Sequence, residues 1–441
     1  MKIGRVMNHA FKYTFFVFVL IFLTWSSKAQ ENTLTLSAAL GKALENNYGI
    51  IISESQTDIA ELNNDWGTAG RYPSIGFDVA SSNNIELIDN SLGNRLSGGI
   101  GMNWTLFDGY RVNITKNKLD KLENLAKGRS AVVVENTIQE VILGYYNVLL
   151  QKEQLDVLER VMGLSRDRYE YEQMRRELGS SLTYHVLQAQ NVYLEDSASY
   201  LHQQVVLRNT IRNLNFVLGE EASARWNFTE SFEPDTGDYK LGNLLDKMRS
   251  NNQTLQNQYA SLMIRKEDTR LRESELYPSL RLSAGLDNSF SRTKNEGMDA
   301  LTTKTVAPYA NVSLSYDIYT GGTRRQAIEI ARINEEIAQT EIEEMQHSLT
   351  NVLFNEYDLY NVRNTLLDVA YENLEAAELN LEIAEEKFKS GAINSFNYRD
   401  IQLIYLNAAL QRLRAVYNLI DSNTSLTRLI GGFVEEEAMI E

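Results

Sequence analysis

The chain has 441 residues, with 43 lysines and arginines against 59 aspartates and glutamates, which gives a net charge of −16. Such acidity makes nucleic acid an unfavourable partner. The sequence contains no cysteine, which excludes disulfides, thiolate metal sites and cysteine nucleophiles, and only 4 prolines, which favours long uninterrupted elements.

Residues 1–29 have the pattern of a cleaved secretory signal peptide. Basic residues precede an apolar run at 15–25 that is short for a membrane span, and the small residues Ser27 and Ala29 follow it. We therefore expect the mature chain to begin at Gln30, the alternative being an uncleaved anchor helix. No later run approaches 18 apolar residues, so a membrane-embedded part would consist of β-strands.

After this leader the chain repeats itself at two fixed offsets. The pair Asn46-Asn47 recurs 205 positions later as Asn251-Asn252, and Gly109 recurs 212 positions later as Gly321. Residues 107–219 align with 319–431 without a gap, which predicts two copies of one structural unit. The predicted organisation is a signal peptide at 1–29, a first repeat at 30–219, a linker at 220–240, a second repeat at 241–432 and an acidic tail at 433–441.

Each repeat opens with apolar residues at helical spacing and continues to a Tyr-Pro pair. Proline ends a helix and forces the residue before it into an extended conformation. Pro73 and Pro278 are therefore expected to mark the breaks between helix and strand. In the first repeat this predicts a single opening helix over residues 37–71.

Alternating apolar and polar residues then predict two strands in each repeat. Ile75, Phe77 and Val79 begin this alternation, and Tyr316 and Ile318 end it. One face carries large apolar residues and the other Ser, Gly, Asn and Thr, which suits a sandwich or a lipid-facing barrel with a wet interior. Two copies of the chain would supply 8 strands and a filled interior, whereas three would supply 12 and a pore. The aromatic residues expected near strand ends are Tyr72, Trp104, Phe107, Tyr110, Tyr277, Tyr309, Tyr316 and Tyr319.

Glycine turns separate the strands from long helices. The turns are Asp108-Gly109 and Gly321-Gly322 after the strands, and Gly179 and Gly391 at the far ends of the long helices. Residues 111–178 contain no proline and predict a 68-residue helix about 100 Å long. A second helix is expected at 183–218. The opening helix and this one would together lie along the whole length of the long helix.

The order of helix, two strands, long helix and helix, with its Tyr-Pro pairs and glycine turns, resembles TolC-type outer-membrane efflux and secretion channels over about residues 34–432. The resemblance implies a mainly α fold with a small β part. Long antiparallel helical hairpins would form an α-barrel tunnel, and four strands per chain would contribute to a 12-stranded trimeric transmembrane β-barrel. Such a homotrimer lies in the outer membrane, extends into the periplasm and provides a passive exit duct for an efflux pump or a type I secretion system.

The same resemblance implies partners and sites. The helical tips would dock a periplasmic adaptor protein that connects the channel to an inner-membrane pump of the RND or ABC type, and the strands would contact outer-membrane lipid. The expected adaptor-contact residues are Gly179, Ser180, Ser181, Gly391, Ala392, Asn394 and Ser395. These tips are at the same time ordinary helix-turn signals.

The expected tunnel gate departs from the family pattern. Family members often place carboxylates at the sixth and ninth positions after each tip glycine, and these positions are Asn397, Asp400, His185 and Gln188 in this chain. Only Asp400 is an acid. In a trimer it would form a ring of three carboxylates that favours cations, and His185 would add positive charge in acid. The alternative is that Asp400 is a solvated helix residue.

Two other classes of protein remain open at this point. A structural periplasmic or surface coiled-coil protein would explain the helical seams but not the alternating strands. An exported hydrolase would need convergent catalytic groups, and the sequence has no HExxH, P-loop or GxSxG pattern. We therefore predict no enzymatic activity, no catalytic or metal-binding residues and no cofactor.

Overall fold

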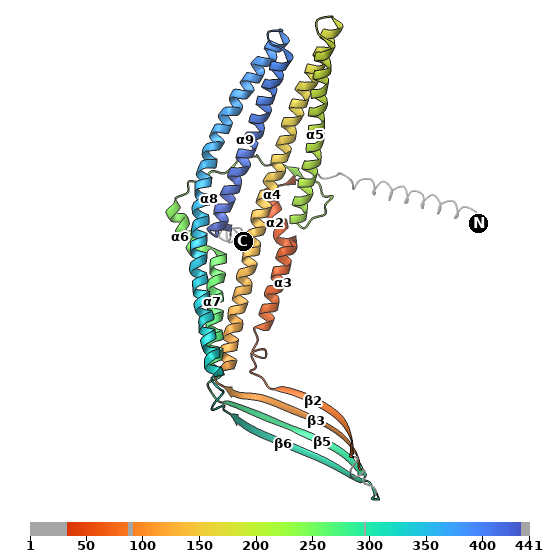
Figure 1. Ribbon diagram of the computed structural model, residues 1–441, viewed down its shortest axis with the longest axis vertical. Helices are drawn as coiled ribbons and strands as arrows, with labels where there is room; N and C mark the ends of the chain where they lie inside the picture. Colours follow the sequence, from red (N-terminus) through yellow and green to blue (C-terminus); the bar gives the residue numbers. More distant parts are fainter. Residues whose placement is uncertain (1–32, 87–90, 295–296, 434–441) are drawn as a thin grey trace, which may run out of the picture.

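The computed structural model describes residues 33–86, 91–294 and 297–433, so the signal-peptide prediction and all but the first residue of the acidic tail lie outside the described residues. A long helical section ends in a β-sheet (Figure 1). The first half contains α2 (Leu36–Asn46), α3 (Tyr48–Asn63), β2 (Ser74–Glu86), β3 (Ser91–Asp108), α4 (Arg111–Glu177) and α5 (Thr183–Val217). The second half contains α6 (Leu241–Asn251), α7 (Gln253–Ser274), β5 (Ser279–Lys294), β6 (Leu301–Ser315), α8 (Thr323–Lys389) and α9 (Ser395–Leu429).

The long helices of the two halves have identical lengths. α4 and α8 each contain 67 residues, and α5 and α9 each contain 35. Both pairs begin and end 212 positions apart, as the gapless offset predicts. None of the helices in the described ranges has the length and hydropathy of a membrane span.

The opening helix is not continuous, which corrects the prediction of one helix over 37–71. Asn47 interrupts the opening helix of the first repeat, and Asn252 interrupts that of the second. The side chain of each caps the helix that follows, α3 or α7, by accepting backbone N–H groups. The same two amides donate to the carbonyls of Val217, at 2.7 Å, and Leu429, at 3.0 Å. The repeated Asn-Asn pair therefore joins the opening helices to the ends of α5 and α9.

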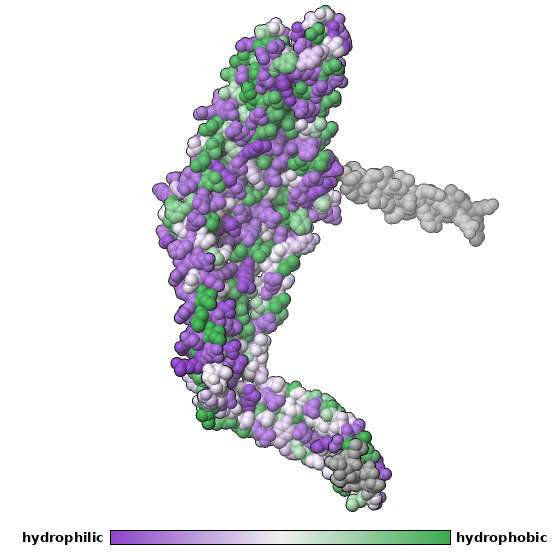
Figure 2. Space-filling view, viewed as in Figure 1, coloured by the Kyte–Doolittle hydropathy of each residue, from purple (hydrophilic) through white to green (hydrophobic). Residues whose placement is uncertain are grey.

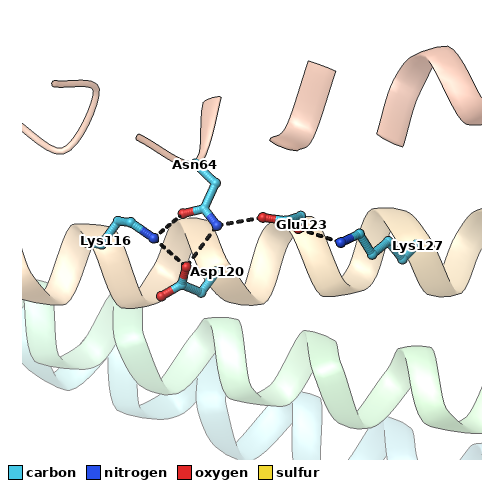
Figure 3. Close-up of polar contacts among 5 residues, drawn as sticks. All are labelled: Asn64, Lys116, Asp120, Glu123 and Lys127. Carbon is cyan, nitrogen blue, oxygen red and sulfur yellow. Dashed lines mark hydrogen bonds and ion pairs between the residues drawn. The ribbon is translucent and has the colours of Figure 1, made fainter. Parts of the chain in front are cut away.

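Helix α3 ends at Asn63, well before Pro73, whereas α7 continues to Ser274. Figure 3 shows a polar network around Asn64, the residue that follows α3. The amide of Asn64 donates to Asp120 at 2.8 Å and to Glu123, and it accepts a 2.7 Å hydrogen bond from Lys116. These contacts hold the end of α3 on α4, and the chain then turns before β2. Both prolines still stand directly before a strand, at Ser74 and Ser279.

The four long strands form an antiparallel sheet in the order β2-β3-β5-β6. The register places Phe77, Ile100 and Leu286 in one row on one face. Residues of the opposite alternation, including Asp78, Gly99 and Asp287, form a polar face. β2 and β6 are the two edges, and within the described residues neither outer edge is paired.

Three aromatic or apolar positions differ from the sequence prediction. Tyr309 lies in the middle of β6, not at a strand end. Its hydroxyl lies over the paired Gly101 and Gly285 on the polar face, because a Cβ added at these positions would lie 3.1 and 2.7 Å from it. Tyr316 and Ile318 lie beyond the end of β6 at Ser315, since the chain leaves the sheet earlier than the alternation suggests.

The main hydrophobic core lies near the middle of the long helices. Tyr145, Val141 and Val148 of α4 are fully buried there, and the Tyr145 hydroxyl donates to the carbonyl of Leu34 at 2.9 Å. Leu34 belongs to the short strand β1 (Thr33–Leu34), which pairs in parallel with β4 (Asn227–Phe228) of the connecting segment. This core fixes the two hairpins, α4–α5 and α8–α9, whose free ends form the tips.

Candidate functional site at the helical tips

Both hairpins end in the same glycine turn. Gly179 and Gly391 have left-handed φ angles of 74° and 80°, which a residue with a Cβ adopts only at a cost. In each turn the next residue closes the helix end: the N–H of Ser180 donates to the carbonyl of Arg175, and the N–H of Ala392 to that of Lys387, both at 2.8 Å. This is the hydrogen-bond pattern of a glycine-terminated helix.

The two tips differ in how the returning helix begins. Asn394 caps α9, because its side-chain oxygen accepts from the N–H groups of Phe396 and Asn397 at 3.1 and 2.9 Å. No side chain caps α5. Ser181 instead donates a 2.6 Å hydrogen bond to the buried carboxylate of Glu172.

A cleft of 380 Å³ lies between the two tips. Residues of both hairpins line it, namely Glu172, Arg175, Gly179, Ser180, Ser181, Leu182, His185, Asn394, Ser395 and Phe396. The rings of His185 and Phe396 meet edge to face, with centroids 6.1 Å apart. The structure thus brings five of the predicted tip residues, Gly179, Ser180, Ser181, Asn394 and Ser395, to one cleft, and it places His185 beside them. Gly391 and Ala392 form the turn of the second tip outside this lining.

A buried ion-pair network lies next to this cleft. Arg399 of α9 donates two hydrogen bonds of 2.8 Å to the carboxylate of Asp196 on α5. Arg168 of α4 is 4% exposed, and it donates to the carbonyl of Ser395 at 3.2 Å. Burial lowers the pKa of Arg168 to about 10, with a further contribution from Arg399, so Arg168 stays charged at neutral pH. The network therefore ties the two hairpins together near their tips.

The sequence contained a signal for this network that the pattern analysis missed. Buried positions of α4 continue at 3 and 4 spacing through Val161, Ser165, Arg168 and Glu172. Asp196 lies in a buried seven-residue series on α5, between Ala189 and Gln203. Charged residues at seam positions of a helix need partners, because a buried charge without one is costly.

The chain matches the family model described as outer membrane efflux protein over residues 39–220 and 244–432. It belongs to this family. Members are transport channels of the outer membrane and not enzymes. No curated protein matches the sequence at a significant level.

Solved structures show the same fold. CusC matches with a TM-score of 0.74 and 15% identity, over 90% of this chain and 92% of that chain. VceC from Vibrio cholerae gives 0.71 and 11%, over 90% and 96%. CmeC from Campylobacter jejuni gives 0.70 and 16%, over 90% and 85%.

In this outer membrane efflux protein the four gate candidates have different surroundings. Asp400 and Asn397 are exposed, whereas His185 and Gln188 are half-buried. Within the described residues Asp400 makes no hydrogen bond or ion pair, while the adjacent Arg399 is held by Asp196. The Asp400 carboxylate is therefore exposed to solvent.

The predicted turn residues lie between the sheet and the long helices. Asp108 ends β3, and its carboxylate accepts the N–H of Val112 at 3.4 Å. Gly109, Gly321 and Gly322 all have left-handed φ angles. A Cβ added at Gly109 would lie 2.4 Å from the carbonyl oxygen of Ser274, so this position requires glycine for space as well as for conformation.

Proposed function

We propose that three copies of the chain form an outer-membrane channel that provides a passive exit duct. The observation that carries this proposal is the sheet, which has four strands, two open edges and one apolar face. An unpaired edge invites pairing with another chain. Four strands cannot enclose a lumen, whereas three copies supply a 12-stranded barrel with an open interior.

Exposed apolar seams on two helices, α5 and α8, also support assembly with neighbouring copies. Along α5, Leu187, Leu194 and Leu201 recur every seven residues and are 53, 56 and 59% exposed. Along α8, Leu359, Val362, Leu366 and Val369 form a second exposed seam at 3 and 4 spacing. Figure 2 shows hydrophobic residues running in strips along a largely hydrophilic rod. α5 of one copy and α8 of the next would bury these seams and close the tunnel.

The tips are the proposed docking site for a periplasmic adaptor. Their support is the cleft between the hairpins, where serine hydroxyls, backbone groups and the apolar Leu182 and Phe396 lie together. Members of this family generally work as trimers with adaptor and inner-membrane pump proteins. The pump is of the RND or ABC type, and the leader at 1–29 directs export of the chain.

We also propose that the Arg399–Asp196 pair keeps the tips closed. Separating the hairpins would break its two hydrogen bonds and expose Arg168. Once the tips are open, a ring of three Asp400 carboxylates would meet ions entering the tunnel and favour cations.

Conductance of the purified protein in planar lipid bilayers tests this function. A channel predicts discrete current steps from the assembled protein. The alternative, a structural coiled-coil protein without a pore, predicts no current steps. This alternative also gives the apolar face of the sheet no function.

A further inference from the structure

The apolar face of the sheet ends at a group of cations. On β5 this face reads Leu280, Leu282, Ala284, Leu286, Asn288 and Phe290, and it then changes to Arg292 and Lys294. On the neighbouring β6, Lys304 pairs with Phe290 in the register. All three cations are exposed. We call Arg292, Lys294 and Lys304 the outer-rim basic surface.

The length of the apolar column places this surface at a membrane boundary. From Leu280 to Phe290 the strand advances about 34 Å, at about 3.4 Å per residue. A tilt of about 40° reduces this to about 26 Å along the membrane normal, close to the apolar band of about 25 Å on transmembrane barrels. The outer-rim basic surface therefore begins where hydrocarbon gives way to headgroups, in the leaflet farther from the helices.

The three cations have no acidic partner in the described part of the chain. No carboxylate there lies within 4 Å of their nitrogens, whereas Arg324 at the opposite end of the sheet is paired with Asp317. The Lys304 ammonium lies 5.9 Å from the centroid of the Phe290 ring. Arg292 faces Thr302 and Asn94 across the strands, and neither carries charge.

We propose that the outer-rim basic surface binds a membrane lipid whose headgroup carries more than one phosphate. Diagonal positions on adjacent strands, such as Arg292 and Lys304, are about 7–8 Å apart and their long side chains can converge on one phosphate. Lys294, two residues further along, reaches a second one. Cations beside a headgroup layer are attracted to anionic lipid, and phosphate satisfies both guanidinium and ammonium donors. This inference rests on the proposed outer-membrane function.

The chain offers a matched control for this surface. Arg95 pairs with Ser291 in the register, one residue from Arg292, and therefore lies at the same height on the opposite, polar face. Arg95→Ser removes the same charge from the lumen side that Arg292→Ser removes from the lipid side. Lys304→Thr serves as a second, independent change on β6.

Lipid binding to the detergent-solubilised trimer, measured by native mass spectrometry, tests the inference. The probes are diphosphoryl lipid A, monophosphoryl lipid A and phosphatidylcholine. We expect the wild type to retain the diphosphoryl lipid most strongly. The Arg292→Ser/Lys304→Thr variant is expected to bind it about tenfold more weakly, or about 1.4 kcal/mol. Arg95→Ser is expected to bind it as the wild type does.

These spectra, together with conductance in planar bilayers, separate a failure of the lipid-binding inference from a failure of the proposed channel function. Unchanged retention of diphosphoryl lipid A by the double variant and by both single variants would overturn the inference, as would equal retention of phosphatidylcholine by the wild type. Displacement of the lipid by inorganic phosphate at equal concentration would also overturn it, since free phosphate would then be the ligand. A wild type that conducts as a trimer in these cases leaves the proposed function intact, and a wild type without a trimer contradicts that function itself.

Discussion

Tyr110 and Gly322 occupy equivalent positions, 212 residues apart, and both have left-handed backbone, with φ angles of 66° and 85°. Each directly precedes a 67-residue helix. A left-handed conformation costs a residue with a Cβ about 1–2 kcal/mol. The ring of Tyr110 packs edge to face on Phe107, with centroids 5.4 Å apart, which offsets part of that cost. The duplicated turn has therefore kept its geometry while its residues changed.

Alanine at the two preceding glycines should separate the cost of conformation from the cost of space. Gly109 and Gly321 have φ angles of 69° and 63°, so the conformational penalty of Gly109→Ala and Gly321→Ala is nearly the same. Only at Gly109 would the new methyl meet backbone, the carbonyl oxygen of Ser274. We expect Gly321→Ala to lower the free energy of unfolding by about 1 kcal/mol and Gly109→Ala by about 3 kcal/mol. Denaturant midpoints of the two variants measure this, and equal losses would contradict it.

Removing Arg399 should open the tips. Arg399→Ala leaves the carboxylate of Asp196 largely buried without its cation, which costs about 3 kcal/mol when a buried pair is broken. The hairpins should then separate, and the single-channel conductance in planar bilayers should rise. The exchange Arg399→Asp/Asp196→Arg restores the pair and should return the conductance toward the wild-type value. A conductance unchanged in Arg399→Ala would show that this pair does not hold the tips.

Bulky residues at the tip glycines should block docking without blocking assembly. Gly179→Leu and Gly391→Leu force a side chain into left-handed backbone at each turn, yet a Cβ there meets no atom within 4 Å. We expect export in cells to be lost while the trimer mass is unchanged. Export at the wild-type rate in both variants would remove the tips from the docking site.

Ion selectivity should depend on Asp400. Asp400→Asn removes the exposed carboxylate, and we expect most of the preference for cations to disappear from reversal potentials measured under a salt gradient. Asn397→Asp adds a carboxylate at the neighbouring exposed position and should strengthen that preference. Identical reversal potentials in the wild type and Asp400→Asn would exclude the ring as the selectivity element.

Stability should depend on pH through Glu135 of α4. Burial raises the pKa of this carboxyl to about 7, although Arg428 opposes the rise. Because this pKa lies above the ordinary glutamate value of 4.5, the folded state holds the proton more tightly than the unfolded state does. The wild type should therefore lose stability as the pH rises from about 4.5 to above 7. Glu135→Gln should remove this loss and exceed the wild type by about 2–3 kcal/mol at pH 8 but not at pH 4.

Unfolding in denaturant at the two pH values checks the Glu135 prediction. Glu140 lies on the same helix but is exposed, so Glu140→Gln provides the control substitution. A stability difference between wild type and Glu135→Gln that is the same at both pH values would contradict the assignment.

Periodicity and glycine spacing predicted the parts of the fold that depend on local sequence. The 212-residue offset between Gly179 and Gly391 fixed the equal lengths of the hairpins, and alternation found the four strands. The break at Asn47 was missed although its cause is local, since the Asn47 side chain caps α3 by accepting the N–H groups of Gly49 and Ile50. The break at Asn64 depends on side chains more than 50 residues away, such as Asp120, which sequence spacing does not show. The Arg399–Asp196 pair was missed because the seven-residue spacing of Ala189, Asp196 and Gln203 marks Asp196 as buried but does not show which distant cation is its partner.

The mass of the purified, detergent-solubilised channel tests the central claim most directly. A sheet of four strands with two open edges predicts an assembly of three chains, recorded by native mass spectrometry as a single species of three times the chain mass. A stable assembly of one or two chains that still conducts ions would contradict the account.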